Sequence, residues 1–455
     1  MKGSRSLTIV IKVGTSSIVD EVTHEPILSI LTLIVETASN LHRNGHKVII
    51  VSSGAIGVGL RRMDMDKKPK NLPRKQALAA VGQCRLVSLW DSLFGHLRLP
   101  VAQILLTRND IADRTQYLNA QNTLGELLSM GVIPIVNEND TLSVSEIKFG
   151  DNDTLSAITA AMAHADYLFL MTDVDCLYSS NPRTNPDAEP IEVVDDISSL
   201  EADVSSAGSS LGTGGMGTKI VAAKLATSAG VTTIITKSST PNNVHDIVGY
   251  LRATASPSDT PLLHPVSSSD GSESGDSHLK VDPPLHTRFL PAMNPIRSRS
   301  FWILHGLTPR GSVTIDEGAF VALQDKAGLL PAGVVGVEGH FHQQEAVRLL
   351  VVDTPSTGSD LDGEIQLCAA EPREVGRILV NYSSNEINRI KGVRSSQIHR
   401  ILGYADSEYI ALRENISLME DRPSRPVTPG PELWRTTSVT SNSNHHHHPV
   451  HNYRE

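Results

Sequence analysis

The 455-residue sequence is poor in aromatic side chains and in cysteine. Phe, Trp and Tyr make up 4% of the chain, which suits the aliphatic sheets of α/β proteins better than a β-sandwich core. The three cysteines, Cys84, Cys176 and Cys368, are scattered and odd in number. They indicate neither a disulfide framework nor a metal site, and they fit a reducing compartment.

The chain also lacks an excess of positive charge and any long hydrophobic run. Its formal net charge is -10, so no global basic field points to nucleic acid as a partner. No apolar stretch of signal-peptide length precedes Lys12, and nothing approaches the length of a membrane span. We therefore expect a cytoplasmic protein with no membrane partner. The length predicts two or three domains.

What the sequence does contain, from Leu7 to about Tyr250, is an alternation of strand and helix patterns. Short apolar strands separated by helices predict a mostly parallel sheet covered on both faces. The predicted strands are Leu7–Val13, Lys47–Val51, Val101–Leu106, Val132–Val136, Tyr167–Met171 and Val231–Thr236. We assign residues 1–252 to this α/β domain.

The pattern changes after Leu251. Residues 253–299, which include a Ser/Pro-rich stretch, are assigned to a linker or insertion. Short β-like segments with glycine turns then predict a small, mainly β domain over 300–420. Residues 421–455 are polar, carry the run His445–His448, and are assigned to a disordered tail.

A glycine-rich loop closed by a lysine, Gly212–Lys219, precedes a helical pattern. Backbone amides in such a loop can approach a phosphate closely, at a helix N-terminus that favours an anion. No strand pattern precedes the loop, which argues against a dinucleotide fingerprint, and Thr218 precedes Lys219 where a P-loop has Lys-Ser/Thr. The alternative is a plain glycine-rich helix cap.

Polar groups follow several predicted strands where those strands end. Lys12 lies inside the first strand, just before Gly14-Thr15-Ser16-Ser17, and Ser53 follows the second strand. Alternatives are an edge-strand lysine that reaches water and an ordinary serine cap. Ligands of open α/β sheets bind at these carboxyl ends, so we expect the groups to converge.

Further polar clusters follow later strands. These are Asn137-Glu138-Asn139-Asp140, Gly150-Asp151-Asn152-Asp153 and Thr172-Asp173. The clusters contain no histidine or cysteine as an obvious base or nucleophile. Lysines, amides and acids suit phosphoryl transfer to an acceptor that needs no deprotonation. A carboxylate, with a Glu pKa near ~4.3, is such an acceptor.

As a set, these motifs resemble the glutamate 5-kinase family over roughly residues 7 to 250. The matching stretches are Ile11–Ser16, Ser52–Ile56, Ala80–Gln83, Leu106–Arg108, Asn137–Asp140, Gly150–Asp153, Thr172–Asp173 and Gly212–Lys219. The resemblance implies the amino-acid-kinase fold, an αβα sandwich with a mainly parallel sheet. It also implies ATP-dependent phosphorylation of L-glutamate to γ-glutamyl phosphate, the first step of proline synthesis.

The resemblance also implies roles for individual residues. Lys12 and Lys219 would neutralise the transferring phosphoryl group, and Asp153 would orient them. Ser53, Asp140 and Asn152 would hold glutamate. Mg²⁺ would bridge the phosphates of ATP, with no protein side chain assigned as a direct metal ligand. The residues expected to bind ATP are Lys12, Thr172, Asp173, Thr213, Gly214, Gly215, Met216, Gly217, Thr218 and Lys219.

The region from Phe301 resembles the PUA domain, through Thr314–Ala319 and Ile401–Tyr404. RNA is not expected as a partner, because no basic stripe is evident in the sequence. We also expect a homo-oligomer and, from the resemblance, feedback inhibition by proline. Two alternatives remain open: another amino-acid kinase, such as an aspartokinase or carbamate-type enzyme, and a non-enzymatic regulatory or RNA-binding protein that retains the fold.

Overall fold

The computed structural model describes residues 5–142, 151–197, 200, 215–254, 282–293, 295–296, 298–352 and 372–419. Its larger sheet has eight strands in the order β3-β4-β2-β1-β5-β9-β10-β8. All neighbouring strands are parallel except β9 and β10. The bounds are β1 Thr8–Val13, β2 Lys47–Ser52, β3 Val101–Leu106, β4 Ile133–Glu138, β5 Tyr167–Thr172, β8 Val193–Val194, β9 Thr232–Lys237 and β10 Thr287–Phe289.

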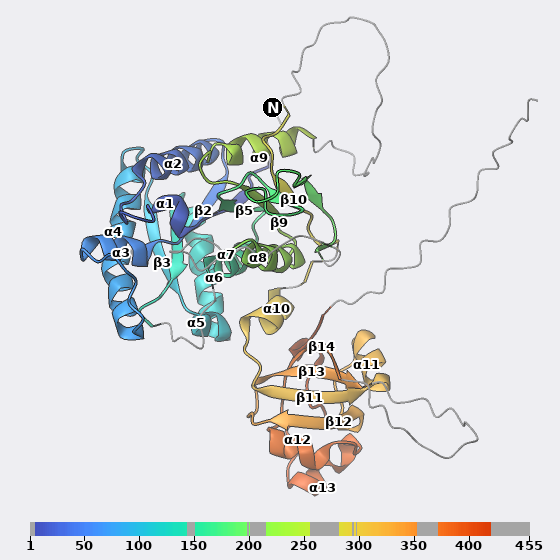
Figure 1. Ribbon diagram of the computed structural model, residues 1–455. Helices are drawn as coiled ribbons and strands as arrows, with labels where there is room; N and C mark the ends of the chain where they lie inside the picture. The colour runs from blue at the N-terminus through green and yellow to red at the C-terminus, as the bar shows by residue number, and fades with distance from the viewer. Residues whose placement is uncertain are drawn as a thin grey trace, which may run out of the picture. The chain divides into compact units, whose positions relative to one another are not determined.

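Helices cover both faces of this sheet, as the alternation of patterns predicts (Figure 1). One face packs on α6, α7 and α8, and the other on α2, α4 and α9. The helices are α1 Thr15–Ile18, α2 Leu28–Arg43, α3 Ala55–Arg62, α4 Leu72–Gly95, α5 Arg108–Ala112, α6 Arg114–Ser129, α7 Asn152–Met162, α8 Met216–Ser228 and α9 Asn243–Thr254. A two-stranded ribbon, β6 Leu177–Tyr178 with β7 Pro190–Ile191, forms a separate sheet that is joined to β10 by hydrogen bonds through Thr287. The expected αβα sandwich is confirmed.

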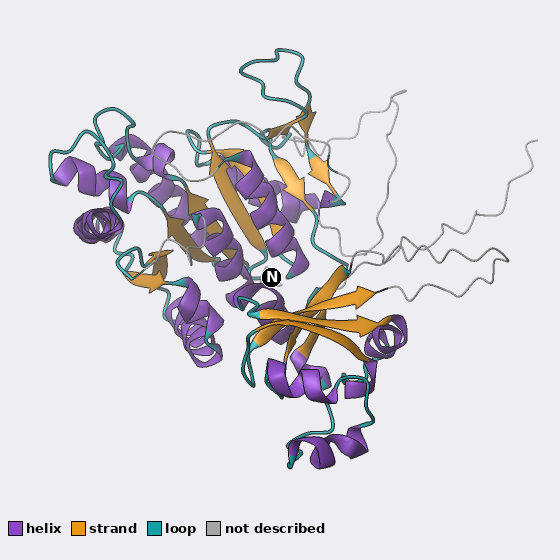
Figure 2. Ribbon diagram, turned by 60° about the horizontal axis from the view of Figure 1, so that its bottom comes forward, coloured by secondary structure: helices purple, strands orange, loops and turns teal. Residues whose placement is uncertain are grey.

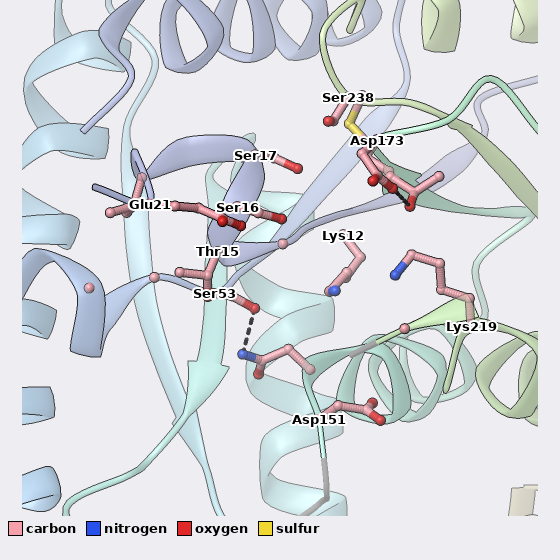
Figure 3. A pocket seen from close by; sticks show the side chains of 18 of the residues that line it. Lys12, Thr15, Ser16, Ser17, Glu21, Ser53, Asp151, Asp173, Lys219 and Ser238 are labelled. Carbon is pink, nitrogen blue, oxygen red and sulfur yellow. Dashed lines mark hydrogen bonds between the residues drawn. The ribbon is translucent and has the colours of Figure 1, made fainter. Parts of the chain in front are cut away.

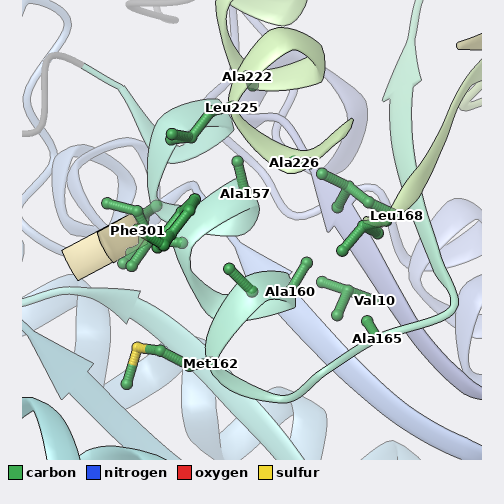
Figure 4. Close-up of a cluster of buried hydrophobic side chains, with 14 of the residues drawn as sticks. Val10, Ala157, Ala160, Met162, Ala165, Leu168, Ala222, Leu225, Ala226 and Phe301 are labelled. Carbon is green, nitrogen blue, oxygen red and sulfur yellow. The ribbon is translucent and has the colours of Figure 1, made fainter. Parts of the chain in front are cut away.

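Small side chains bring α7 and α8 close together over the centre of the sheet. Ala157 and Ala160 of α7 and Ala222 and Ala226 of α8 are fully buried in one cluster, and β1 contributes Val10 to it (Figure 4). A row of alanines lets two helix backbones approach more closely than larger side chains would. This packing fixes the first turns of α7 and α8, which carry Asp153 and Lys219.

The sheet extends beyond the limit at residue 252. Strand β10 lies inside the 253–299 range assigned to a linker, and it pairs antiparallel with β9. Phe301 and Trp302 belong to the same buried cluster as the α7–α8 residues, and Trp302 Nε1 donates to the Ile111 carbonyl at 3.0 Å. A three-residue strand between polar stretches leaves no periodic pattern, which is why composition alone places the boundary too early.

The mainly β region is confirmed as a second, five-stranded sheet in the order β12-β11-β13-β14-β15. Its strands are β11 Gly311–Asp316, β12 Val334–Gly339, β13 Ala346–Val352, β14 Arg373–Leu379 and β15 Ile416–Leu418. The accompanying helices are α10 Ser298–Phe301, the π-helical turn η2 Trp302–Gly306, α11 Glu317–Gln324, α12 Ser384–Ile390 and α13 Ile398–Leu402, with short 3-10 turns η3 Pro331–Gly333, η4 Ser395–Gln397 and η5 Arg413–Asn415. Figure 2 shows the strands of both sheets in orange and the helices in purple.

The second sheet has a hydrophobic core of its own, and its Ala346 and Leu379 also join the cluster of the α7–α8 residues. Val313, Leu349 and Ile378 are fully buried in the core of the second sheet. None of the helices in the described ranges is long and apolar enough to cross a membrane. The assigned tail, 421–455, lies outside the described residues.

Candidate active site

The predicted site residues converge at the carboxyl ends of the parallel strands. A cavity of about 710 Å³ opens there, and its lining includes residues from β1, β4, β5 and the N-terminal ends of α3, α7 and α8. The expected residues that line it are Lys12, Ser53, Asp140, Asn152, Thr172, Asp173, Gly215, Met216 and Lys219. The strand-end rule thus places residues from distant parts of the sequence around one space.

Two lysines meet one buried carboxylate at the base of this cavity. Lys12 Nζ lies 2.5 Å from Asp153 Oδ1, and Lys219 Nζ lies 3.4 Å from Asp153 Oδ2. Asp153 is fully buried and both lysines are almost so. In Figure 3 the Lys12 and Lys219 amino groups point toward the same space. Because one carboxylate faces two ammonium groups, the cluster keeps a net positive charge that suits an anionic ligand.

The electrostatics of the cluster follow from burial and from these contacts. Burial raises the pKa of Asp153, but Lys12 and Lys219 outweigh it and lower the value to about 2. Burial, followed by repulsion from Lys12, lowers the pKa of Lys219, although Asp153 opposes this. Burial also raises the pKa of the neighbouring Asp151. Asp153 is therefore ionised at neutral pH and holds the two cations together.

Ser53 and Asn152 meet across the cavity from different elements. Asn152 Nδ2 donates to Ser53 Oγ at 2.8 Å, shown as a dashed line in Figure 3. The preceding Asp151 caps α7 by accepting from the Thr154 amide at 2.7 Å, which sets the direction of Asn152. Gly54 has φ +106° at the start of α3, a conformation that L side chains rarely adopt. A glycine is needed there to turn the chain directly after Ser53.

One polar pair beside this site was given no role in the sequence analysis. Asn137 Nδ2 donates to Gln83 Oε1 at 2.8 Å, and both side chains are buried. Gly82, next to Gln83, lies so close to α3 that a Cβ would fall 1.7 Å from the Ala55 carbonyl oxygen. Asn137 and Gln83 both lie within motifs of the resemblance. Only the fold shows that they form a hydrogen bond although they are 54 positions apart in the sequence.

The opposite side of the cavity is formed by the end of β5 and the loop after it. Thr172 Oγ1 donates to Asp173 Oδ1 at 3.0 Å, and Arg183 Nη2 lies 2.6 Å from Asp173 Oδ2. Ser238, after β9, donates its amide to the Thr172 carbonyl at 2.6 Å. Arg183 and Ser238 line the cavity but were not predicted, because each lies in a polar turn without a distinctive pattern.

The glycine-rich loop is described only in part. Thr213 and Gly214 lie outside the described residues, whereas Gly215 and Met216 begin α8 at the cavity wall. The Thr218 hydroxyl lies 2.8 Å from Asp153 Oδ2 and 2.8 Å from the Gly215 carbonyl, both possible acceptors. Its side chain thus faces the buried carboxylate of Asp153 rather than the cavity, and Gly217 does not line the cavity either.

The described part of the site offers few side chains that could bind a metal ion together. Among the described residues no group of three or more His, Cys, Asp or Glu side chains could hold a metal ion. Mg²⁺ commonly binds through substrate phosphates with few protein ligands. On the β5 side of the cavity the carboxylate of Asp173 is paired with Arg183.

Fold and site together define a kinase of the amino-acid-kinase class. The model of the "Amino acid kinase family" matches residues 7–237, and that of the "PUA domain" matches residues 311–402. The chain therefore belongs to the amino acid kinase family and carries a PUA domain. ATP as a substrate follows from the kinase family.

Curated relatives match most of the chain. It is 54% identical over 415 residues to "Probable glutamate 5-kinase" of Schizosaccharomyces pombe, covering 90% of this chain and 93% of the relative. It is 44% identical to "Glutamate 5-kinase" of Cyanothece sp. (strain PCC 7425), covering 90% and 99%. Among solved structures, UMP kinase from Ureaplasma parvum is similar with a TM-score of 0.39 and 16% identity, covering 54% of this chain and 96% of that one.

Proposed function

We propose that the protein is a glutamate 5-kinase, which transfers the γ-phosphoryl group of ATP to the γ-carboxylate of L-glutamate. The observation that carries the proposal is the buried Lys12–Asp153–Lys219 cluster at the base of a polar cavity. The relatives named glutamate 5-kinase support the choice of acceptor.

The reaction needs electrostatic stabilisation more than proton transfer. A glutamate γ-carboxylate oxygen attacks the γ-phosphorus, the bond to the β,γ-bridging oxygen breaks, and ADP leaves with that electron pair. The acceptor is already ionised at neutral pH, so no general base is required. In the proposed reaction Lys12 and Lys219 neutralise the negative charge that spreads over the transferring oxygens, and Asp153, which contacts both ammonium groups, keeps them in position.

The two sides of the cavity divide the substrates between them. Ser53 and Asn152, joined by their hydrogen bond, and Asp140 form the glutamate side. Thr172, Asp173 and the start of α8 form the proposed ATP side, where the α8 N-terminus would favour the phosphates. Mg²⁺ supplies charge neutralisation on the phosphates when it is bound.

The direct test is ATP turnover by the purified full-length chain with glutamate, with aspartate and without acceptor. We expect turnover that depends on glutamate, with an acyl phosphate product that hydroxylamine traps as a hydroxamate. Turnover with aspartate alone would identify a different amino-acid kinase. Absence of turnover with any acceptor would favour a non-enzymatic role.

Proline is proposed as an inhibitor that competes with glutamate near the loop from Asp140 to Asp151. The proposal rests on the family resemblance, since residues 143–150 lie outside the described part of the chain. Proline titrations at low and at saturating glutamate test it. Inhibition that saturating glutamate does not relieve would contradict a shared site. A homo-oligomer remains a separate expectation, tested by light scattering.

A further inference from the structure

A second cavity, of about 560 Å³, lies in the PUA region and is unrelated to the residues proposed for phosphoryl transfer. We call it the arginine cavity. Its lining includes three arginines, Arg310, Arg348 and Arg377, and one carboxylate, Glu338. Pro309, Gly311, Ser312 and Gly339 complete it. The surplus of cations is unexpected in a chain whose formal net charge is -10.

The sheet places the two strand arginines side by side. Arg348 on β13 stands directly opposite Arg377 on β14, and Ser312 on β11 stands opposite Arg348 on its other side. Residues directly opposite in neighbouring strands project from the same face, and like charges in that relation repel one another. The pairing therefore costs stability unless an anion lies between the two guanidinium groups.

The protein itself neutralises these arginines poorly. The Arg377 side chain is 21% exposed; its Nη1 atom donates to the Leu307 carbonyl at 3.0 Å, whereas its Nε atom is buried without a hydrogen-bond partner. Its nearest carboxylate, Glu374, lies 3.8 Å away, which is beyond hydrogen-bonding range. Within the described residues, Arg310 and Arg348 make no ion pair at all. Arg310 and Arg348 are exposed and, in the described part of the chain, without an ion pair, and they lie beside the partly buried Arg377, so the three guanidinium groups can bind an oxyanion together.

The row across the sheet also has a direction. Glu338 on β12 faces Ser312 on β11, with the Ser312 hydroxyl 3.4 Å from Glu338 Oε2. The order across the face is thus carboxylate, hydroxyl, guanidinium, guanidinium. Two strand spacings separate Glu338 from Arg348, which is about 10 Å. A ligand that matches the row has an anionic group at one end and a hydrogen-bond donor at the other.

We propose that the arginine cavity binds a small phosphate-bearing molecule, with its phosphate between Arg348 and Arg377 and a hydroxyl or amino group toward Glu338. Arginine pairs hold phosphate oxygens through bidentate hydrogen bonds. A cavity of this size accommodates one small molecule. Glu338 repels a continuous polyanion, so a single phosphorylated compound fits the row better than a nucleic-acid backbone.

The test uses the full-length protein and calorimetric titration with two probes, inorganic pyrophosphate and ribose 5-phosphate. The Arg348 side chain is exposed, and its variants are Arg348→Ala and Arg348→Glu. Arg400→Ala, at an arginine on α13 that is also exposed and lies outside the cavity, is the matched control. Probe binding that is lost in Lys219→Ala is assigned to the kinase cavity and not to the arginine cavity. Losing one charged hydrogen-bond partner weakens binding by about tenfold or more.

We expect a class of sites that persists in Lys219→Ala and Arg400→Ala, weakens in Arg348→Ala and is abolished in Arg348→Glu. Glutamate-dependent turnover measured without probe should be the same in the Arg348 variants and the wild type, so failure of the proposed kinase function would leave this test intact. Equal probe binding in Arg348→Glu and the wild type would overturn the proposal. So would binding of a short single-stranded RNA by a chain that binds neither small probe.

Discussion

The two sheets of the molecule handle positive charge in opposite ways. The kinase sheet buries Lys12 and Lys219 against a single ionised carboxylate, Asp153. The sheet of the PUA region instead sets Arg348 beside Arg377 with no carboxylate in hydrogen-bonding range. Buried ion pairs recover little net stability after desolvation. The first arrangement therefore suits the proposed transfer, because it holds the cations in fixed positions, whereas the second suits the proposed reversible ligand.

The comparison depends on where the kinase region ends along the chain. Truncating the chain at that limit is expected to have the largest effect, a loss of cooperative folding. Composition alone places a cut near residue 255. Such a cut removes β10 and the buried Phe289, Phe301 and Trp302. Losing one buried Phe or Trp side chain costs about 3–5 kcal/mol, against a total stability of about 5–15 kcal/mol. We expect residues 1–255 not to fold cooperatively.

A longer fragment, residues 1–308, keeps β10 with Phe289, and also keeps Phe301 and Trp302. We expect it to fold and to retain glutamate-dependent turnover, because every residue proposed for catalysis lies at or before Lys219. Circular dichroism with thermal melting, followed by the turnover assay, compares the two fragments. A folded, active 1–255 fragment would show that β10 and the aromatics contribute little. A folded but inactive 1–308 fragment would mean that the PUA region completes the site.

The next largest effect concerns the paired lysines themselves. Removing one well-placed cation costs about 3 kcal/mol of transition-state stabilisation, or about a hundredfold in rate. We expect Lys12→Ala and Lys219→Ala to lower kcat by that order, with less change in the glutamate KM. Lys224→Ala, exposed on the same helix as Lys219, is the control. Steady-state kinetics decide the matter, and kcat near the wild-type value in both variants would reject the assignment.

A smaller effect is expected on the glutamate side of the cavity. Asp140→Ala and Asn152→Ala remove groups that bind the ground and transition states alike, so the glutamate KM should rise by about tenfold with kcat largely kept. Asn119→Ala, exposed on α6, serves as the control. An increase in the KM for ATP without an increase in the KM for glutamate would mean that these residues bind ATP and not glutamate.

Much of the kinase region could be predicted from the sequence. The strands containing Lys12 and preceding Ser53 are apolar runs, and polar motifs after them fall at one sheet edge by the rule for parallel sheets. The family resemblance is confirmed by the family model and by relatives that match most of the chain. The individual roles of the site residues stay predictions, since geometry alone does not assign them.

Other features could not be predicted because they depend on register or on contacts distant in sequence. The Arg348–Arg377 pair arises from the alignment of β13 with β14, and a shift by one residue would move one arginine to the other face. The Asn137–Gln83 hydrogen bond joins a strand end to the middle of a helix. The contact of the Thr218 hydroxyl with Asp153 joins two helices, and the expected place of Thr218 at ATP stays a prediction. Single-sequence patterns carry none of this information.

The last prediction is a difference in acid stability that reports on the Lys12–Asp153–Lys219 cluster. The pKa of Asp153 falls from an ordinary value of 3.8 to about 2 in the folded protein. Its contribution to stability is therefore complete above pH 4 and is lost as the pH falls toward 2, by about 2 kcal/mol. The raised pKa of Asp151 acts in the opposite sense, because the folded state takes up that proton more readily, and offsets part of the loss. Urea unfolding at several pH values between 2 and 5 should show a shallower pH dependence in Asp153→Asn than in the wild type. Asp187→Asn, exposed in the loop between β6 and β7, should behave as the wild type. Identical slopes in all three proteins would mean that the lysines do not depress the titration of Asp153, and the contrast between paired and unpaired cations would lose its electrostatic basis.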